Sequence, residues 1–242
     1  MQAFVLCAGR GKRLRPYSDH LPKPLLPILG KPLLAIIFDQ LIDQGFKRIG
    51  LNAWHLKEKV LEFVKAYRKR VPHIKIELFE EPELLGTCGA LRNASPFFSK
   101  PTLVINGDIL TNFSLQVVYE AFLRSAPPCL MFLHRYPGLN RVRVEDGWIC
   151  GFGEDSEKGW AYTGLQVVSP EWIKLLPEER ELVPAYERLL AQGYRIKALV
   201  ATGFYWRDIG TPENYLKAQE EILSGKVHVP YAPCRGKVCL PV

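Results

Sequence analysis

The 242-residue sequence contains no apolar run that approaches the ~20 residues needed to cross a membrane. It also lacks a CxxC pair: the six cysteines are scattered, and most lie inside apolar runs, where cysteine usually acts as a small buried hydrophobe. These absences argue against a membrane protein, a zinc site and a disulfide framework, although the closely spaced Cys234 and Cys239 leave one disulfide as a less favoured alternative. No basic segment precedes the first apolar stretch, so we expect a cytoplasmic protein without a signal peptide.

The composition is that of a folded domain with a basic surface. Hydrophobic residues make up 48% of the chain and aromatic residues 11%, which is ample for a packed core. The formal net charge of +7 suits a nucleic-acid binder or an enzyme that handles triphosphates. The densest basic cluster, at 65–70, ends a helical pattern, where cations interact favourably with the helix C-terminus. Aromatic residues are not interleaved with a basic face, so we expect no nucleic-acid partner.

The first half of the chain alternates strand and helix patterns. Apolar runs predict strands at 2–8, 47–53, 74–79 and 102–106, and helical patterns predict helices at 32–45, 55–70 and 114–125. The last of these strands is almost wholly apolar, as expected for a strand that is covered on both faces. Such alternation indicates βαβ units on a mainly parallel sheet.

The second half reads differently. Strands are predicted at 129–135, 161–169, 194–199 and 204–206, helices at 171–176, 181–192 and 212–223, and a hairpin around Asp146-Gly147. Together the halves predict an α/β protein, a Rossmann-like three-layer sandwich with a mixed, mainly parallel central sheet, over residues 1–223. The short C-terminal extension, 224–242, has no helical period, and we interpret it either as the stub of a β-rich extension or as a strand-like contact in a homodimer.

A glycine turn follows the first strand. Gly9 and Gly11 allow the backbone to turn sharply and to bring N–H groups close to phosphate oxygens, and Arg13 and Arg15 add donors that suit a triphosphate. Two commoner phosphate motifs are incomplete here. The dinucleotide fingerprint lacks its third glycine, and a P-loop would need Ser or Thr after its lysine. By pattern alone, a plain tight turn explains the segment equally well.

Lys23 lies between two prolines just downstream of this turn. Because proline fixes the local backbone, the lysine is held stiffly, and a rigid ammonium near the phosphate loop could neutralise charge on a phosphorus under attack. The alternative is a solvated lysine in a stiffened loop.

Two aspartates are candidate metal ligands. Asp108 follows the apolar strand 102–106, and ligands of open parallel sheets bind outside the carboxyl ends of their strands. Asp208 follows the short strand that contains Trp206 and precedes a helix. Two carboxylates that converge near a triphosphate would bind Mg²⁺, which prefers few carboxylates together with phosphates and water. Taken singly, either aspartate is equally well explained as a helix cap or a turn residue.

These segments together resemble one family. The pattern Gly9-x-Gly11-x-Arg13-Leu14-x-Pro16 followed by Pro22-Lys23-Pro24-Leu25-x-Pro27 closely resembles the signature of sugar-1-phosphate nucleotidyltransferases. The resemblance continues through 85–90, 106–108, 161–164 and 206–212, so it covers roughly residues 1–223. The combined motif is far more specific than either half alone.

The resemblance implies an enzyme that joins a nucleoside triphosphate to a sugar 1-phosphate, releases pyrophosphate and so serves the biosynthesis of NDP-sugars. It implies catalytic roles for Arg13, Lys23, Asp108 and Asp208, with Mg²⁺ as cofactor on the two aspartates. The implied nucleotide-binding residues are Leu6, Ala8, Gly9, Gly11, Lys12, Arg13, Lys23, Glu81, Gly86 and Thr87, of which the last three lie near the base. The implied sugar-phosphate residues are Asn106, Gly138, Thr163 and Gly164.

Several alternatives stay open at this point. The 85–87 loop looks most like that of guanylyltransferase members, but uridylyl and thymidylyl members differ by few contacts. Many relatives carry Glu-Lys-Pro before the sugar loop, whereas this chain has Glu157-Lys158-Gly159, so Lys158 is better explained as a solvated loop lysine. The competing functions are nucleotidyl transfer to another phosphate, such as phosphocholine, and a non-catalytic regulatory subunit that binds a nucleotide sugar.

Overall fold

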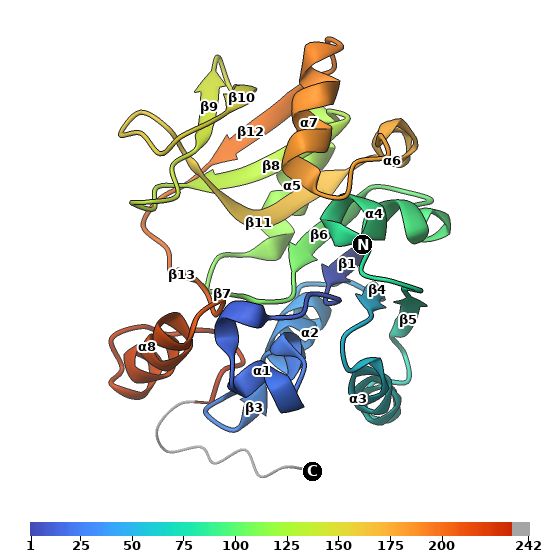
Figure 1. Cartoon of the computed structure of the whole chain (residues 1–242), viewed down its shortest axis with the longest axis vertical. Helices are drawn as coiled ribbons and strands as arrows, with labels where there is room; N and C mark the ends of the chain where they lie inside the picture. The colour runs from blue at the N-terminus through green and yellow to red at the C-terminus, as the bar shows by residue number, and fades with distance from the viewer. Residues whose placement is uncertain (234–242) are drawn as a thin grey trace.

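A nine-stranded sheet runs through the computed structural model, which describes residues 1–233 (Figure 1). The strand order is β5-β4-β1-β6-β11-β8-β12-β10-β9. The strands of the first half are β1 (Gln2–Leu6), β4 (Arg48–Ala53), β5 (Lys75–Glu80) and β6 (Thr102–Asn106). Those of the second half are β8 (Cys129–His134), β9 (Val142–Glu145), β10 (Trp148–Phe152), β11 (Ala161–Val168) and β12 (Ile196–Val200).

The sheet is mixed and mainly parallel, as predicted. β1 pairs in parallel with β4 and β6, β4 with β5, and β8 with β12. The pairs that β11 forms with β6 and β8, and that β10 forms with β9 and β12, are antiparallel. All strands of this sheet except β10 and β11 therefore run in the same direction.

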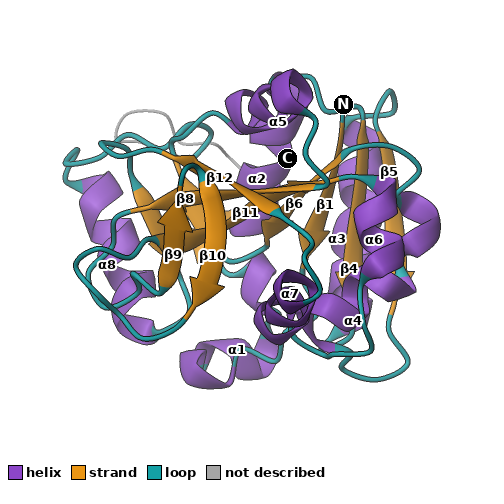
Figure 2. Cartoon of the chain, turned by 90° about the horizontal axis from the view of Figure 1, so that it is seen from above, coloured by secondary structure: helices purple, strands orange, loops and turns teal. Residues whose placement is uncertain are grey.

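Helices cover both faces of the sheet, which confirms the three-layer prediction. One apolar cluster contains residues of α2 (Leu33–Asp43), α3 (Lys57–Arg70), α5 (Leu115–Ser125) and α8 (Pro212–Leu223), and the other contains residues of α4 (Gly86–Asn93), α6 (Pro170–Leu175) and α7 (Leu182–Ala191). Figure 2 shows α5 on one side of the sheet and α7 on the other. In β1, Ala3 and Val5 belong to the first cluster and Phe4 to the second, so successive side chains are buried on opposite faces.

Local signals in the sequence set several element ends. Ser114 caps α5 by accepting the Val117 N–H, and Thr211 caps α8 by accepting the Asn214 N–H. Asp146 and Gly147 both have positive φ, 49° and 76°, in the turn between β9 and β10. The long elements predicted from periodicity are accordingly present, with ends that differ by one or two residues.

Among the shortest elements, β13 (Trp206–Asp208) was predicted with shifted bounds and the others were not predicted. β7 (Ile109–Thr111) follows Asp108 and pairs with β13, which the sequence placed two residues too early. The 3₁₀ turns, the short helix α1 (Tyr17–His20) and the two-residue strands β2 (Pro27–Ile28) and β3 (Lys31–Pro32) also went unpredicted. Elements of this length carry too few residues to show a period.

The C-terminal segment packs onto the same core. Val229 and Ala232 are buried, and the backbone carbonyls of His228 and Tyr231 accept hydrogen bonds from Asn112 and Lys31, at 3.2 and 2.8 Å. Residues 224–233 form no strand, while Cys234, Cys239 and the rest of the extension lie outside the described residues. The boundary at 223 stays a prediction. Within residues 1–233, no helix combines the length and the apolar character that crossing a bilayer requires.

Candidate active site

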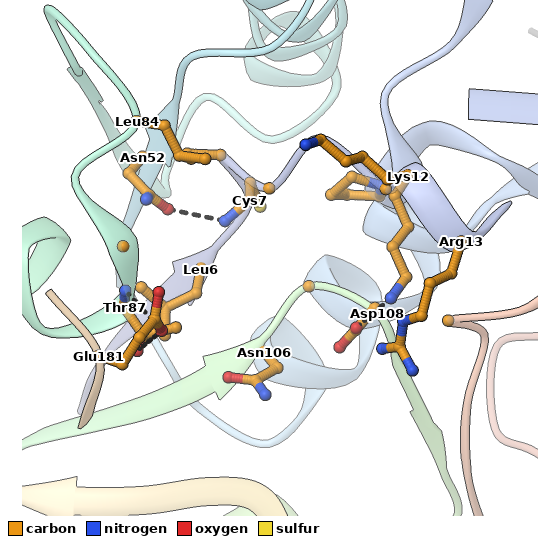
Figure 3. A pocket seen from close by; sticks show the side chains of 18 residues that line it. Leu6, Cys7, Lys12, Arg13, Asn52, Leu84, Thr87, Asn106, Asp108 and Glu181 are labelled. Atoms are coloured by element: carbon orange, nitrogen blue, oxygen red, sulfur yellow. Dashed lines mark hydrogen bonds and ion pairs between the residues drawn. The ribbon is translucent and has the colours of Figure 1, made fainter. Parts of the chain in front are cut away.

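A cleft of about 340 Å³ lies at the carboxyl ends of β1, β4 and β6 (Figure 3). It is lined by Leu6, Cys7, Ala8, Gly9, Gly11, Lys12, Arg13, Lys23, Pro24, Asn52, Leu84, Gly86, Thr87, Asn106, Gly107, Asp108, Glu181 and Gly210. Lys12, Arg13 and Asp108 lie at one end, and Leu84, Asn52, Thr87 and Glu181 lie at the other (Figure 3). The cleft thus brings together most of the residues that the sequence predicted for the nucleotide.

The glycine turn after β1, which is the predicted phosphate loop, depends on Gly11 for its conformation. The φ of Gly11 is +64°, and an added Cβ would lie 3.0 Å from the Cβ of Ser18, so the position requires glycine. The Ser18 hydroxyl donates to the Gly11 carbonyl at 2.8 Å, and the Leu14 N–H donates to the same carbonyl at 2.8 Å. Leu14 is fully buried and anchors the turn. Around Gly9, by contrast, the space for a side chain is open. Arg15, which was predicted to add a donor for the triphosphate, does not line the cleft and forms an ion pair with Asp19 at 2.9 Å.

Lys23 and Asp108 form an ion pair in the cleft. Lys23 begins a 3₁₀ turn between Pro22 and Pro24, and its side chain is only 12% exposed, so it does not extend freely into solvent. Asp108 follows Gly107, whose N–H donates to the Leu6 carbonyl at 2.9 Å. A Cβ on Gly107 would lie 2.8 Å from that oxygen, so glycine lets the two chain segments approach. The predicted proximity of phosphate loop, lysine and first aspartate is therefore present.

Asp208 is the last residue of β13, whereas the sequence predicted that it follows this strand, and the pairing of β13 with the unpredicted β7 brings it to the same place. In the β7–β13 pair Asp208 lies opposite Ile109, and the Ile209 N–H donates to the Asp108 carbonyl at 2.9 Å. The Gly210 N–H donates to Asp208 Oδ1 at 2.8 Å. Gly210 lines the cleft, and a Cβ on it would lie 3.2 Å from Lys23 Nζ and 3.3 Å from Arg13 Nη2. These short distances place Asp208, Lys23 and Arg13 around one point.

The two aspartates fit a hard divalent cation. Asp108 Oδ1 is buried and has no hydrogen-bond partner within residues 1–233, which is a costly state for a carboxylate oxygen without a ligand. In the same part of the chain, no three His, Cys, Asp or Glu side chains form a potential metal site. A pair of carboxylates suits Mg²⁺, which keeps several waters and takes further oxygens from substrate phosphates.

Glu81 lies beneath the cleft rather than on its wall. It is 3% exposed; its Oε1 accepts from Asn52 Nδ2 at 2.6 Å, and its Oε2 accepts from the Leu85 N–H at 3.0 Å. Asn52 Oδ1 in turn accepts the Cys7 N–H at 2.7 Å. Burial raises the pKa of the Glu81 carboxyl. In this arrangement Glu81 ties the 82–87 loop to β4 and β1, and its contact with a base stays a prediction.

The segment 84–88, which ends in the first turn of α4, is fastened by residues that precede α7. The Thr87 hydroxyl donates to Glu181 Oε2 at 2.8 Å and accepts the Leu182 N–H at 3.0 Å. Gly86 has φ +76°, and a Cβ there would lie 2.4 Å from the Arg180 carbonyl oxygen. Glu181 lines the cleft but was not predicted as a site residue. Its partner Thr87 lies 94 positions away, so no short motif indicates the contact.

The predicted sugar-phosphate residues are only partly assembled. Asn106 lines the cleft, and Gly164, with φ +78°, is so close to it that a Cβ would lie 2.8 Å from Asn106 Nδ2. The buried hydroxyl of Thr163 donates to the Phe132 carbonyl at 2.7 Å. Gly138 lies in an exposed loop, where its N–H donates to Asp155 at 3.2 Å. Of the four predicted sugar-phosphate residues, Asn106 alone lines the cleft, and the exposed Lys158 does not line it either.

Two further lining residues, Asn52 and Gly210, were not predicted as site residues, although Gly210 belongs to the 206–212 motif. Asn52 is a buried polar residue that follows the apolar stretch 49–51 of β4, next to β1, at the strand end where ligands bind. Gly210 directly follows the Asp208-Ile209 dipeptide, and its lack of a side chain leaves space beside the Asp208 carboxylate.

Cations and carboxylates lie together at the carboxyl ends of parallel strands, which is where open α/β sheets bind their ligands. The family described as "Nucleotidyl transferase" matches residues 2–137, more than half of the chain. The chain belongs to this family, and the resemblance predicted from the phosphate loop and the Lys23 segment is confirmed.

Individual relatives agree with this assignment. The chain is 30% identical over 235 residues to the bifunctional protein GlmU of Methanocaldococcus jannaschii, with 92% of this chain and 54% of that protein covered, so it spans about half the length of this relative. It is 29% identical to the D-glycero-alpha-D-manno-heptose 1-phosphate guanylyltransferase of Campylobacter jejuni, with 89% and 97% covered. Among solved structures, HddC from Yersinia pseudotuberculosis superposes with a TM-score of 0.73 at 28% identity, covering 91% and 98%.

The fold is shared more widely than the sequence. A structure described as a putative glucose-1-phosphate thymidylyltransferase from Bacillus anthracis superposes with a TM-score of 0.79 at 17% identity, over 91% of this chain and 94% of that one. This likeness confirms the predicted Rossmann-like fold class.

Proposed function

We propose that this chain transfers a nucleotidyl group from a nucleoside triphosphate to a sugar 1-phosphate and forms an NDP-sugar and pyrophosphate. The observation that carries the proposal is the convergence of the phosphate loop, Lys23 and Asp108 on one cleft, with Asp208 held next to Gly210 on the cleft wall. The names of the relatives, which include guanylyl and uridylyl transferases that act on sugar 1-phosphates, support the same reaction.

In this reaction the protein has to position the two substrates and neutralise negative charge on the phosphates. An oxygen of the sugar phosphate attacks the α-phosphorus of the nucleotide, a new P–O bond forms, and pyrophosphate leaves with the electrons of the broken bond. The attacking oxygen is already anionic near neutral pH, so no strong general base is needed. Lys23 and Arg13 can contact the phosphates from one side, while backbone N–H groups of the glycine turn hold the leaving group.

We propose that Asp108 and Asp208 hold Mg²⁺. The unpartnered Oδ1 of Asp108 is the observation that supports this role. When bound, the cation neutralises charge on the α-phosphate and orients both substrates. The nucleotide is proposed to lie along the glycine turn, with its base toward Leu6, Gly86 and Thr87. The chain is further proposed to work in the cytoplasm, since the unpaired Cys7, Cys88, Cys129 and Cys150 suit a reducing compartment.

A pyrophosphate-release assay tests the reaction. Purified protein is incubated with Mg²⁺, each of ATP, GTP, CTP, UTP and dTTP, and a panel of sugar 1-phosphates; at least one pair is expected to release pyrophosphate. Because Lys23 and Asp108 act on the reacting phosphates, Lys23→Ala and Asp108→Asn are each expected to lower kcat/KM by about 100-fold or more. No release with any pair would contradict the proposed function.

The matched controls come from a second ion pair of the same chain. Lys31 and Asp39 interact at 2.6 Å and are as deeply placed as the catalytic pair, with side chains 19% and 23% exposed, but neither lines the cleft. Lys31→Ala and Asp39→Asn are expected to change kcat/KM by less than about threefold. If they impair the reaction as strongly as the cleft variants, the assignment of Lys23 and Asp108 is wrong.

A further inference from the structure

We infer that Asn214 is a positioning residue for the Asp208 carboxylate, and that a buried ion pair between Arg207 and Glu221 fixes the direction in which the Asn214 amide points. The inference deepens the proposed function and rests on its assignment of Asp208 to the cation.

The chain of contacts begins at a buried ion pair. Arg207, on β13, and Glu221, on α8, are 8% and 7% exposed. Arg207 Nη2 donates to Glu221 Oε1 at 2.8 Å, and Arg207 Nε donates to Glu221 Oε2 at 3.0 Å. The Tyr205 hydroxyl also donates to Oε2, at 3.0 Å. A two-point contact of this kind leaves the planar guanidinium no freedom to rotate.

The remaining guanidinium nitrogen sets the orientation of Asn214. Arg207 Nη1 donates to Asn214 Oδ1 at 3.3 Å. A guanidinium can only donate hydrogen bonds, so the amide must turn its oxygen toward Arg207 and its NH₂ group away. On that opposite side, Asn214 Nδ2 donates to Asp208 Oδ2 at 3.4 Å.

The Asp208 carboxylate is thereby held from two sides. Oδ1 accepts the Gly210 N–H at 2.8 Å, and Oδ2 accepts from Asn214. Each carboxylate oxygen keeps a second lone pair for a cation, because each accepts one hydrogen bond from these partners. Outer contacts of this kind orient metal ligands, and their loss typically weakens metal binding about 10- to 100-fold.

The helix start does not explain the Asn214 side chain. The Thr211 hydroxyl already accepts the Asn214 backbone N–H at 3.3 Å and caps α8. Capping therefore leaves the Asn214 amide unused, and its contacts run toward Arg207 and Asp208 instead.

The test measures cation binding directly. Binding of Mn²⁺, a probe for the Mg²⁺ site, is titrated by electron paramagnetic resonance in the presence of the nucleoside triphosphate. Asn214→Leu, which keeps the shape of the side chain and removes its hydrogen bonds, is expected to raise the Kd for Mn²⁺ about 10-fold. The control is Gln219→Leu on the same helix: it removes the hydrogen bond that the Leu29 N–H donates to Gln219 Oε1, away from the cleft, and is expected to leave the Kd unchanged.

A second variant tests the orienting pair. In Arg207→Met combined with Glu221→Leu, both buried charges are replaced together, so neither is left unpaired. The Asn214 amide is then free to turn, and a similar rise in Kd is expected. Adding Asn214→Leu to this variant is expected to produce little further weakening, since both changes interrupt one chain of contacts.

The outcomes separate this inference from the proposed function. Equal Mn²⁺ affinity of the Asn214→Leu and wild-type proteins, or no Mn²⁺ binding by the wild type, overturns the inference. Fully additive effects overturn the role of Arg207 and Glu221. Weakened Mn²⁺ binding in Asn214→Leu, together with no pyrophosphate from any substrate pair, would instead support the positioning role and contradict the proposed reaction.

Discussion

The two halves of the central sheet treat polar groups differently. In the half formed by β5, β4, β1 and β6, the described residues leave one buried side-chain polar atom without a partner, Asp108 Oδ1, and it lies in the cleft. The other half and its helices contain four such residues away from the cleft, namely His134, Tyr162, Gln166 and Trp172. In the first half the other buried polar side chains within residues 1–233 are hydrogen-bonded, so the single unpartnered atom there indicates a functional site. In the second half unpartnered atoms are more frequent and lie away from the cleft, so they indicate none.

The largest effect on stability and activity is expected from a substitution in the first half, in the turn that carries Asp108. Gly107→Ala would place a Cβ 2.8 Å from the Leu6 carbonyl oxygen, so the β1 and β6 ends would have to move apart. We expect a loss of about 3 kcal/mol in the free energy of unfolding, together with most of the activity. Urea unfolding measures the first and pyrophosphate release the second. The control is Gly153→Ala, which meets no atom within 4 Å and should behave as wild type.

A pH effect is expected in the other half. Burial lowers the pKa of His134 to about 4, below that of an unfolded histidine. Below pH 6.5 the unfolded chain therefore binds more protons than the folded one, so stability is fully present above this pH and falls as the pH drops toward 4. Because the two pKa values differ by about 2.5, the full loss should be about 3 kcal/mol.

The variant His134→Phe, which stays compatible with the neighbouring Phe204 and Trp206 rings, should remove this part of the pH dependence. Unfolding curves at pH 7, 5.5 and 4.5 check the difference between the two proteins. Parallel loss of stability in both would show that another group is responsible.

The smallest effect concerns one side-chain contact between the halves, which are also joined by the pairing of β6 with β11. Thr87, beside the first half, donates to Glu181, which precedes α7 of the second. Thr87→Val keeps the shape and removes the hydroxyl, so the segment 84–88 loses two hydrogen bonds. KM for the nucleotide should rise about fivefold with little change in kcat, because in the proposed binding mode this segment contacts the base rather than the reacting phosphorus. An unchanged KM would place the nucleotide elsewhere in the cleft.

The sequence was sufficient to predict those parts of the fold and of the candidate site whose signals lie within a few neighbouring residues. Short motifs predict the glycine turn, Lys23 between its prolines and the strand that leads to Asp108. Their convergence on one cleft was also predicted. The long helices and strands followed from their periods.

The remainder depends on contacts between distant segments. Glu181 approaches the cleft only because the chain packs α7 against the segment 84–88, and Asp208 approaches Asp108 through strands of three residues. Burial of Glu81 beneath the same segment and exposure of Gly138 likewise depend on packing, which no short motif encodes.

The borders of the sheet affect how the chain behaves at high concentration. β5 and β9 are the outermost strands, and a bare edge strand offers unpaired backbone groups to neighbouring molecules. Both borders carry exposed charges, Lys75 and Glu80 on β5 and Arg143 and Glu145 on β9. These charges disfavour edge-to-edge pairing and protect the nine-stranded sheet from growing into ordered aggregates.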